Sequence, residues 1–238
     1  MSLTEQEQGI EAAALAYAKA HKKALAKQLT DKAVYIPEAQ PVSVFMAGSP
    51  GAGKTEASIE LLARIDGSRV LRIDADELRT LIPGYSGNNA YLFQRAVSVL
   101  VEKIHDMALE QCQSFLLDGT LSHYEVARKN IERSLGRRRM VQILYVYQEP
   151  RLAWNFVQAR EAAEGRRIQP ETFVDQYFAA RDVVNRLKRE YGSAIKVDLL
   201  LKNNDNSHRL YQAGVDQIDS HIPEKYSRAD VERLLAQV

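Results

Sequence analysis

Short apolar runs and longer stretches with helical spacing alternate along most of this chain. The apolar runs predict five strands, at residues 41–47, 69–76, 115–118, 141–147 and 195–201. The stretches between them predict helices at residues 56–63, 90–110, 124–135, 150–165 and 170–190. Strands that alternate with helices are typical of a mostly parallel sheet with right-handed crossovers and helices on both faces. The pattern therefore predicts an α/β fold, a three-layer sandwich around a sheet of about five strands.

An extra amphipathic helix precedes this alternating core. Thr4 followed by Glu7 matches a capping box, and apolar residues recur at helical spacing as far as about Leu29. Such a helix most often packs on the flank of the core, so we favour that role over a regulatory one.

The two ends of the chain differ from the regular middle. Residues 30–40 contain a proline and predict a linker, which divides the chain into an N-terminal helix with its linker, 1–40, and one catalytic domain, 41–238. Near the other end, residues 203–206 predict a short hairpin or loop, and a last helix is expected from about residue 227 to the end.

The stretch between the first core strand and its helix fits the phosphate-binding pattern G-x-x-x-x-G-K-[ST] at every fixed position. Its residues are Gly48, Ser49, Pro50, Gly51, Ala52, Gly53, Lys54 and Thr55. A glycine-rich turn lets backbone N–H groups point at phosphate oxygens, and the following helix adds its positive end. Because the order is strand, loop, helix, an accidental glycine-rich loop is disfavoured. A P-loop kinase-like fold with a nucleoside triphosphate site is expected, in which Lys54 reaches the β and γ phosphates and Thr55 holds Mg²⁺.

Acidic residues end two further predicted strands, where open α/β sheets place their ligands. Asp74 and Asp76 end the second strand, and one could cap the next helix while the other accepts a proton from a substrate hydroxyl. We favour Asp76 as the base. Asp118, followed by Gly119 and Thr120, ends the third strand in a Walker B-like arrangement that supports Mg²⁺, although Asp-Gly turns are also common without any ligand.

Arginines gather around a glycine-bearing turn between two predicted helices. Arg160, Arg166 and Arg167 could neutralise a transferring phosphate from a mobile lid, or form a solvated basic turn. For the run Arg137 to Arg139 we favour the solvated interpretation.

Composition narrows the class of protein. The chain has 238 residues, with 32 Lys and Arg against 31 Asp and Glu, so nothing general attracts it to nucleic acid or an anionic membrane. The single cysteine, Cys112, suits a reducing compartment and is expected in the core. With neither a signal-peptide pattern nor a membrane-spanning run, a cytoplasmic protein is expected. His105, His123 and Trp154 lack partner spacing for metal or catalysis and are interpreted as structural.

The motifs, taken in order, resemble the zeta toxin family over roughly residues 41–191. The likeness is carried by the phosphate loop, residues 73–79, 82–85 and 118–120, Arg160, and residues 167–170. The resemblance implies a kinase that uses ATP and Mg²⁺ to phosphorylate the 3′-hydroxyl of the sugar in UDP-N-acetylglucosamine. It implies Lys54 on ATP, Asp76 as base, and Arg160 and Arg167 on the transferring phosphate. It also implies Mg²⁺ ligands and substrate-side residues, namely Thr55 and Asp118 for the metal and Arg79, Tyr85, Glu102 and Thr120 for the substrate.

Three positions qualify these implications. Glu102 lies off the apolar stripe of its helix, so the pattern alone predicts a solvated residue. Ile82 stands where the family often has histidine, and Asp118 where glutamate is familiar. Because these positions are near the expected acceptor site, other acceptors such as NAD, a small antibiotic or an RNA end stay open.

A nucleotide-controlled binding protein without kinase activity is the alternative from another class, although the guanine-specificity motif is absent from the sequence. A toxin also needs restraint, so we expect either an antitoxin protein or inhibition by the N-terminal helix.

Overall fold

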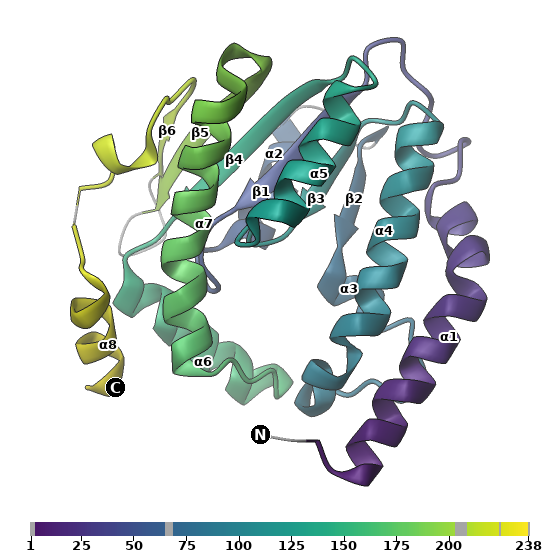
Figure 1. The fold of residues 1–238 in the computed structure, drawn as a ribbon, viewed down its shortest axis with the longest axis horizontal. Coiled ribbons are helices and arrows are strands. Elements are labelled where there is room, and N and C mark those ends of the chain that lie inside the picture. The colour runs from purple at the N-terminus through teal and green to yellow at the C-terminus, as the bar shows by residue number, and fades with distance from the viewer. Residues whose placement is uncertain (1–2, 65–68, 203–208, 224, 238) are drawn as a thin grey trace.

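The computed structural model describes residues 3–64, 69–202, 209–223 and 225–237 (Figure 1). The α-helices are α1 (Glu5–Leu29), α2 (Lys54–Arg64), α3 (Ala75–Arg79), α4 (Gln94–Glu110), α5 (Tyr124–Leu135), α6 (Pro150–Glu164), α7 (Pro170–Tyr191) and α8 (Arg228–Ala236). The strands are β1 (Val42–Ala47), β2 (Leu71–Asp74), β3 (Phe115–Asp118), β4 (Met140–Tyr147), β5 (Ile195–Lys202) and β6 (Arg209–Gln212). Short 3₁₀ helices are η2 (Gly87–Phe93), η3 (Gly192–Ala194) and η4 (Ile218–Ser220).

The strands form one sheet in the order β2-β3-β1-β4-β5-β6. The first five are parallel, which confirms the predicted α/β class, and β6 pairs antiparallel with β5. This sixth strand goes beyond the predicted five because its four residues, at the edge of the sheet, mix polar and apolar side chains and form no apolar run. The hairpin or loop expected at residues 203–206 lies outside the described residues.

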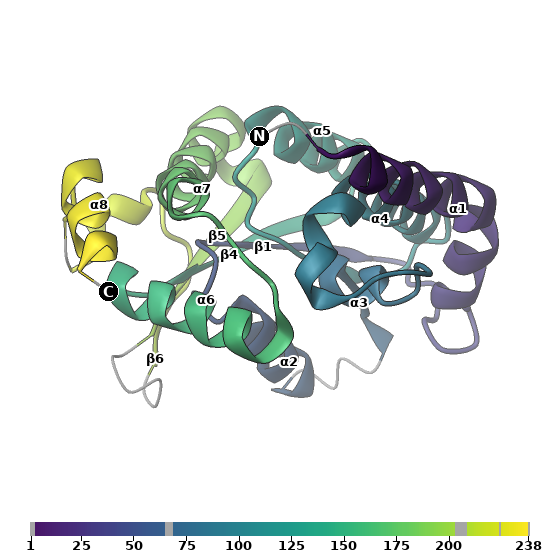
Figure 2. The same cartoon turned by 90° about the horizontal axis from the view of Figure 1, so that it is seen from below.

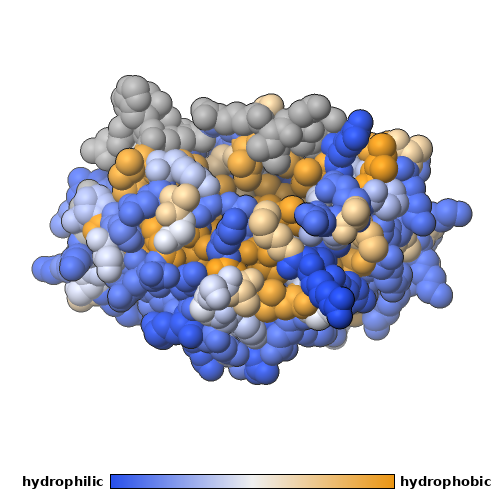
Figure 3. Space-filling model, turned by 90° about the horizontal axis from the view of Figure 1, so that it is seen from above, coloured by the Kyte–Doolittle hydropathy of each residue, from blue (hydrophilic) through white to orange (hydrophobic). Residues whose placement is uncertain are grey.

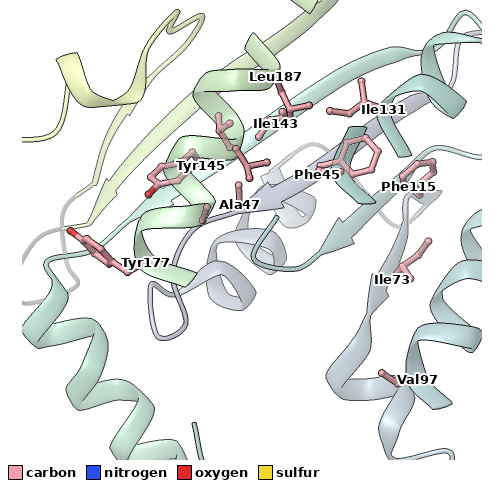
Figure 4. Close-up of a cluster of buried hydrophobic side chains, with 14 of the residues drawn as sticks. Phe45, Ala47, Ile73, Val97, Phe115, Ile131, Ile143, Tyr145, Tyr177 and Leu187 are labelled. Carbon is pink, nitrogen blue, oxygen red and sulfur yellow. The ribbon is translucent and has the colours of Figure 1, made fainter. Parts of the chain in front are cut away.

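Helices cover both faces of the sheet, which gives three layers (Figure 2). The helices α4, α5 and α7 lie on one face and α2 on the other. In β1, Phe45 and Ala47 face the first layer, whereas Val44 and Met46 pack toward α2. The sequence of a central parallel strand that is buried on both faces is an uninterrupted apolar run. This is why residues 41–47 could be predicted as a strand. Figure 4 shows the larger core, where Phe45 and Phe115 lie near Ile131 of α5.

The helix α1 packs along the outer side of α4 (Figures 1 and 2). Small residues on one face make the contact, since Ala14, Ala18 and Ala26 are buried. Near its start, Glu7 accepts a hydrogen bond from the hydroxyl of Tyr91 in η2. The helix therefore shares the core of the fold, as its amphipathic pattern predicted.

Three local expectations differ from the structure. The second strand ends at Asp74 and the helix α3 begins directly after it, because the Asp74 side chain caps that helix. The helix expected at residues 90–110 is divided at Phe93 into η2 and α4, with a non-helical residue, Asn89, inside η2. Cys112 is exposed rather than buried, because the apolar stripe of α4 ends at Leu109 and Cys112 turns the chain with a φ of 54°.

The run Arg137 to Arg139 is only partly a solvated turn. Arg139 is 4% exposed, and it donates hydrogen bonds to Ser43 Oγ at 2.8 Å and to the carbonyl of Val42 at 3.1 Å. A buried guanidinium needs such acceptors. Arg139 therefore joins the start of β4 to β1, a contact between distant residues that charge patterning cannot reveal.

The remaining structural interpretations are confirmed for His105 and Trp154. His105 is buried with its ring 4.7 Å from that of Phe115, and burial lowers its pKa to about 3, so it stays neutral. Trp154 is buried against Phe173 with ring centres 5.2 Å apart.

The edge at the amino ends of the strands has a hydrophilic rim with hydrophobic residues between (Figure 3). Among the described helices, not one combines the length and apolar character required to cross a bilayer.

Candidate functional site

A cavity of ≈ 850 Å³ lies at the carboxyl ends of the strands, the edge seen in Figure 2. The phosphate loop, the ends of β2 and β3, the helices α3 and α6, and the connection from α6 to α7 all contribute to its wall. Most of the predicted site residues therefore come together from segments that are far apart in the sequence.

The phosphate loop follows β1 and leads into α2, in the predicted order. Gly51 has a φ of 69°, and a Cβ there would collide with the carbonyl oxygen of Ala153 in α6. The loop is tied to the neighbouring turn by the Gly48 N–H, which donates to the carbonyl of Thr120 at 3.2 Å. Residues 50–56 line the cavity, whereas Gly48 and Ser49 do not.

Lys54 curls back over the loop. Its Nζ donates to the carbonyls of Ser49 at 2.6 Å and Gly48 at 3.0 Å. Burial lowers the pKa of Lys54 to about 8, although Asp118 and Asp76 oppose the shift. The amine is thus a cation held at a desolvation cost, which an arriving anion would relieve.

The two acids after β2 take different places, as predicted. Asp74 caps α3, since its Oδ1 accepts from the Asp76 N–H at 2.7 Å. Asp76 lies in the first turn of α3, and both acids line the cavity.

Three arginines surround the Asp76 carboxylate. Arg166 Nη1 lies 2.5 Å from its Oδ2, Arg160 Nη2 lies 3.4 Å from the same oxygen, and Arg79 pairs with Oδ1. Burial by itself would raise the pKa of Asp76, but Arg166 and Arg79 outweigh it and hold the pKa below its usual range. Asp76 is therefore ionised well below neutral pH.

Arg72 was not recognised from the sequence, yet it joins both acidic strand ends. Its Nη2 contacts Asp118 Oδ2 at 2.8 Å and Asp74 Oδ2 at 2.5 Å, and its Nε donates to Ser58 Oγ at 3.0 Å. Asp74 and Asp118 are in register on neighbouring parallel strands. A charged residue inside an otherwise buried strand was the available signal, because such a side chain needs partners.

The other candidates divide between the cavity and its surroundings. Arg79 and Thr120 line the cavity. Tyr85 packs against Phe93 instead, with ring centres 5.5 Å apart, and Glu102 is exposed on α4 in an ion pair with Lys129. Arg167 contributes to the cavity wall, but its side chain is 68% exposed and pairs with Glu161.

The 3₁₀ helix η2, at one side of the cavity, touches the end of α6. A Cβ on Gly87 would overlap the carbonyl oxygen of Glu164, and one on Gly165 would overlap the side chain of Asn88. Two backbones approach here as closely as only glycine allows. The connection after α6 therefore rests on η2 and closes one side of the cavity.

This contact makes Gly87→Ala a test of the closed arrangement. We expect a loss of about 1–3 kcal/mol in the free energy of unfolding, because the added methyl must displace backbone. The measurement is urea denaturation. Gly9→Ala is the control, since Gly9 is a helical position with open space around a Cβ and should be neutral or stabilising. Equal stability of the two variants would show that the contact is not maintained in solution.

Comparison with known families agrees with this geometry. The family model for zeta toxin matches residues 25–216. The chain belongs to the zeta toxin family. The match includes the phosphate loop, α3, the last five residues of α1, and the arginines Arg160, Arg166 and Arg167. Membership in this family indicates a P-loop kinase-like phosphotransferase. No match was found among curated proteins.

Solved structures share the fold of this zeta toxin family member at low identity. One comes from the PezAT chromosomal toxin–antitoxin system of Streptococcus pneumoniae, with 16% identity and a TM-score of 0.66 over 99% of this chain and 94% of that one. An AvrRxo1-ORF1:ORF2 complex with ATP has 14% identity and a TM-score of 0.63 over 91% and 83%. A native form of that complex has 15% identity and a TM-score of 0.60, over 84% of this chain and 70% of that one. The zeta toxin fold, including its N-terminal helix and mostly parallel sheet, is thereby confirmed.

Proposed function

We propose that this zeta toxin family member is an ATP-dependent kinase that phosphorylates a hydroxyl of a nucleotide sugar, the 3′-hydroxyl of UDP-N-acetylglucosamine. The observation that carries the proposal is one cavity containing a phosphate loop, a carboxylate and several arginines. Phosphoryl transfer requires little covalent chemistry from the protein and depends on positioning and charge stabilisation. The catalytic unit is residues 41–238, and we place its activity in the cytoplasm.

The position of each side chain supports one role in the proposed reaction. Lys54 neutralises the donor phosphates, and Asp76 accepts the proton of the acceptor hydroxyl as its oxygen attacks the γ phosphorus. Arg160 and Arg167, which lie on opposite sides of the α6 end, stabilise the charge that spreads over the γ phosphate oxygens. Arg79 and Thr120 orient the acceptor, whereas Tyr85 and Glu102 act at most through other residues because they lie outside the cavity wall.

The residues present fit a magnesium ion bound with the nucleotide. Thr55 and Asp118 line the same cavity, and a hydroxyl with a carboxylate is the donor set that Mg²⁺ takes beside phosphates. When bound, Mg²⁺ supplies charge neutralisation across the β and γ phosphates. Arg72 holds Oδ2 of Asp118 without itself lining the cavity, so it orients that carboxylate for the role.

The decisive test is transfer of label from [γ-³²P]ATP to a panel of UDP-sugars, NAD and RNA, with Lys54→Ala as the blank. Label on UDP-N-acetylglucosamine supports the full proposal. Label on NAD or RNA alone would mean that the acceptor is that molecule and not a nucleotide sugar. Release of free phosphate alone would favour a nucleotide-controlled binding protein.

ATP binding should weaken as the pH rises above about 8, the pKa to which burial lowers the free Lys54 amine. Phosphates bind the protonated amine better, so the dissociation constant is flat below this pH and rises above it, by at most about tenfold per pH unit. Calorimetry between about pH 7 and about pH 9.5 measures this slope. Lys54→Met should bind weakly and lose the slope, and an unchanged slope in that variant would contradict the assignment.

A separate antitoxin is the restraint that we propose. The structure neighbour from the PezAT system belongs to a toxin–antitoxin pair. None of the described residues of α1 lines the cavity, and α1 packs on α4 and η2. The N-terminal helix therefore does not cover the nucleotide site in this structure, which counts against the self-inhibition hypothesis.

A further inference from the structure

The proposed base is already occupied by cations in this structure. Arg79 pairs with Oδ1 of Asp76, and Oδ2 carries both Arg166, at 2.5 Å, and Arg160, at 3.4 Å. A base must offer a lone pair to the acceptor hydroxyl within hydrogen-bond reach. Each carboxylate oxygen has two lone pairs, so the two guanidinium groups on Oδ2 leave no room there, and a further donor can reach this oxygen only if one arginine moves.

The three arginines differ in how firmly they are held. Arg79 is 8% exposed and is fixed by a second hydrogen bond, from its Nη2 to Gln94 Oε1 at 2.7 Å. Arg160 is part of α6 and has the longer contact. Arg166 lies in the connection between α6 and α7, directly after Gly165, which ends α6 with a φ of 73°. Arg166 can therefore change partner without any helix being displaced.

The same cavity wall carries the cations that a polyphosphate would attract. Lys54, Arg160, Arg166 and Arg167 all line it. A donor polyphosphate carries several negative charges where Asp76 carries one, so it competes strongly with Asp76 for the arginines that contact this carboxylate. Arg166 combines the closest contact to Oδ2 with a position outside regular structure.

We propose that Arg166 has two successive partners: it pins Asp76 before the donor binds and then moves to the donor's γ phosphate, leaving Oδ2 for the acceptor. This inference rests on the proposed kinase function. In the transfer step, the acceptor oxygen forms a bond to the γ phosphorus, the bond from that phosphorus to the ADP oxygen breaks, and the hydroxyl proton goes to Asp76 Oδ2. The acceptor hydroxyl therefore gains access to Oδ2 only after the donor is in place.

The test follows the Asp76 carboxyl by ¹³C NMR titration, without and with Mg²⁺ and the non-hydrolysable analogue AMP-PNP. Asp76→Asn assigns the signal. In the free protein, Arg166→Met should raise the pKa of Asp76, because a contacting cation is lost. Adding AMP-PNP should raise the pKa of Asp76 in both proteins, because the bound phosphates are negatively charged. The rise should be larger in the wild type than in Arg166→Met, because only in the wild type does Asp76 also lose its contact with Arg166.

The other charged groups near Asp76 are the same in the wild type and in Arg166→Met. They are Asp74, Glu77 and Arg79 at α3, Lys54 in α2, and Arg160 and Glu164 in α6. Arg167→Met is the matched control, because this neighbouring arginine pairs with Glu161 and should leave the pKa of Asp76 unchanged in the free protein. Arg166→Lys keeps the positive charge but lacks the planar guanidinium group, so the pKa of Asp76 in this variant should lie between those of the wild type and Arg166→Met. It also allows the test to be made if the methionine variant folds poorly.

Each outcome is decisive. Equal shifts on adding AMP-PNP in wild type and Arg166→Met would overturn the inference, since Arg166 would then be a fixed ion-pair partner. Because the readout needs no acceptor, that result would leave the kinase proposal standing. Failure of AMP-PNP to bind the wild type would reject the donor site of the proposed function together with the release of Arg166.

Discussion

Asp76→Asn should lower phosphoryl transfer by roughly 10²–10⁴-fold while ATP binding is kept, because a positioned base contributes about this much. The amide keeps the size of the side chain but cannot accept the proton at neutral pH. Asp76 lines the same cavity as Lys54 and the arginines, and this is where the proposed donor and acceptor would meet. The measurement is label transfer to the acceptor together with calorimetry for ATP.

Two comparisons sharpen this result. Asp175→Asn removes an exposed carboxylate on α7 that pairs with Arg228, and transfer should be unchanged. Asp74→Asn should weaken the ion pair with Arg72 while its amide oxygen still caps α3, and it should lower transfer less than Asp76→Asn. Full transfer in Asp76→Asn would remove Asp76 from the mechanism, and a larger loss in Asp74→Asn would exchange the two roles.

Arg72→Met should lower the free energy of unfolding by about 3–5 kcal/mol, because it leaves the buried carboxylates of Asp74 and Asp118 without their shared cation. The two side chains are 8% and 6% exposed, so water replaces little of the lost interaction. The loss should be smaller at low pH, where the carboxyls can take up protons. Urea denaturation at two pH values measures both effects.

The control for Arg72→Met is the same substitution at an arginine that has as many acidic partners but is exposed to solvent. Arg128 pairs with Glu125, Glu132 and Glu190 and is 41% exposed. Exposed ion pairs contribute little to stability, so Arg128→Met should cost far less. Similar losses in the two variants would mean that the Arg72 cluster is as solvated as a surface network.

The Arg72 cluster also bears on the departure of this chain at Asp118, where glutamate is familiar in the family. Asp118 is held by Arg72 and approached by Ser58 Oγ at 3.4 Å. Ser58 in turn donates to the carbonyl of Thr55, the residue beside the phosphate loop lysine, at 2.7 Å. The shorter carboxylate is thus connected to α2 through two neighbours, which gives it a fixed orientation at the cavity.

The sequence determined the features that depend on neighbouring residues. The phosphate loop is a contiguous pattern of glycines before a helix, so Gly48 to Thr55 were assigned without a structure. Parallel strands buried on both faces are uninterrupted apolar runs, which gave β1 and β4. The assignment of one of the two acids, Asp74, as the cap of α3 also followed from local helix chemistry.

Only the tertiary structure decided which distant side chains meet. Arg166 and Arg167 are adjacent and chemically identical, yet one contacts Asp76 and the other Glu161, because successive residues point in different directions. Tyr85 lies within a matching motif and Glu102 at a position implied by the resemblance, but both lie outside the cavity. Arg72 links two strand ends that are 44 positions apart, at Asp74 and Asp118. Side-chain direction and contacts between strands depend on packing across the whole core, which a local pattern does not contain.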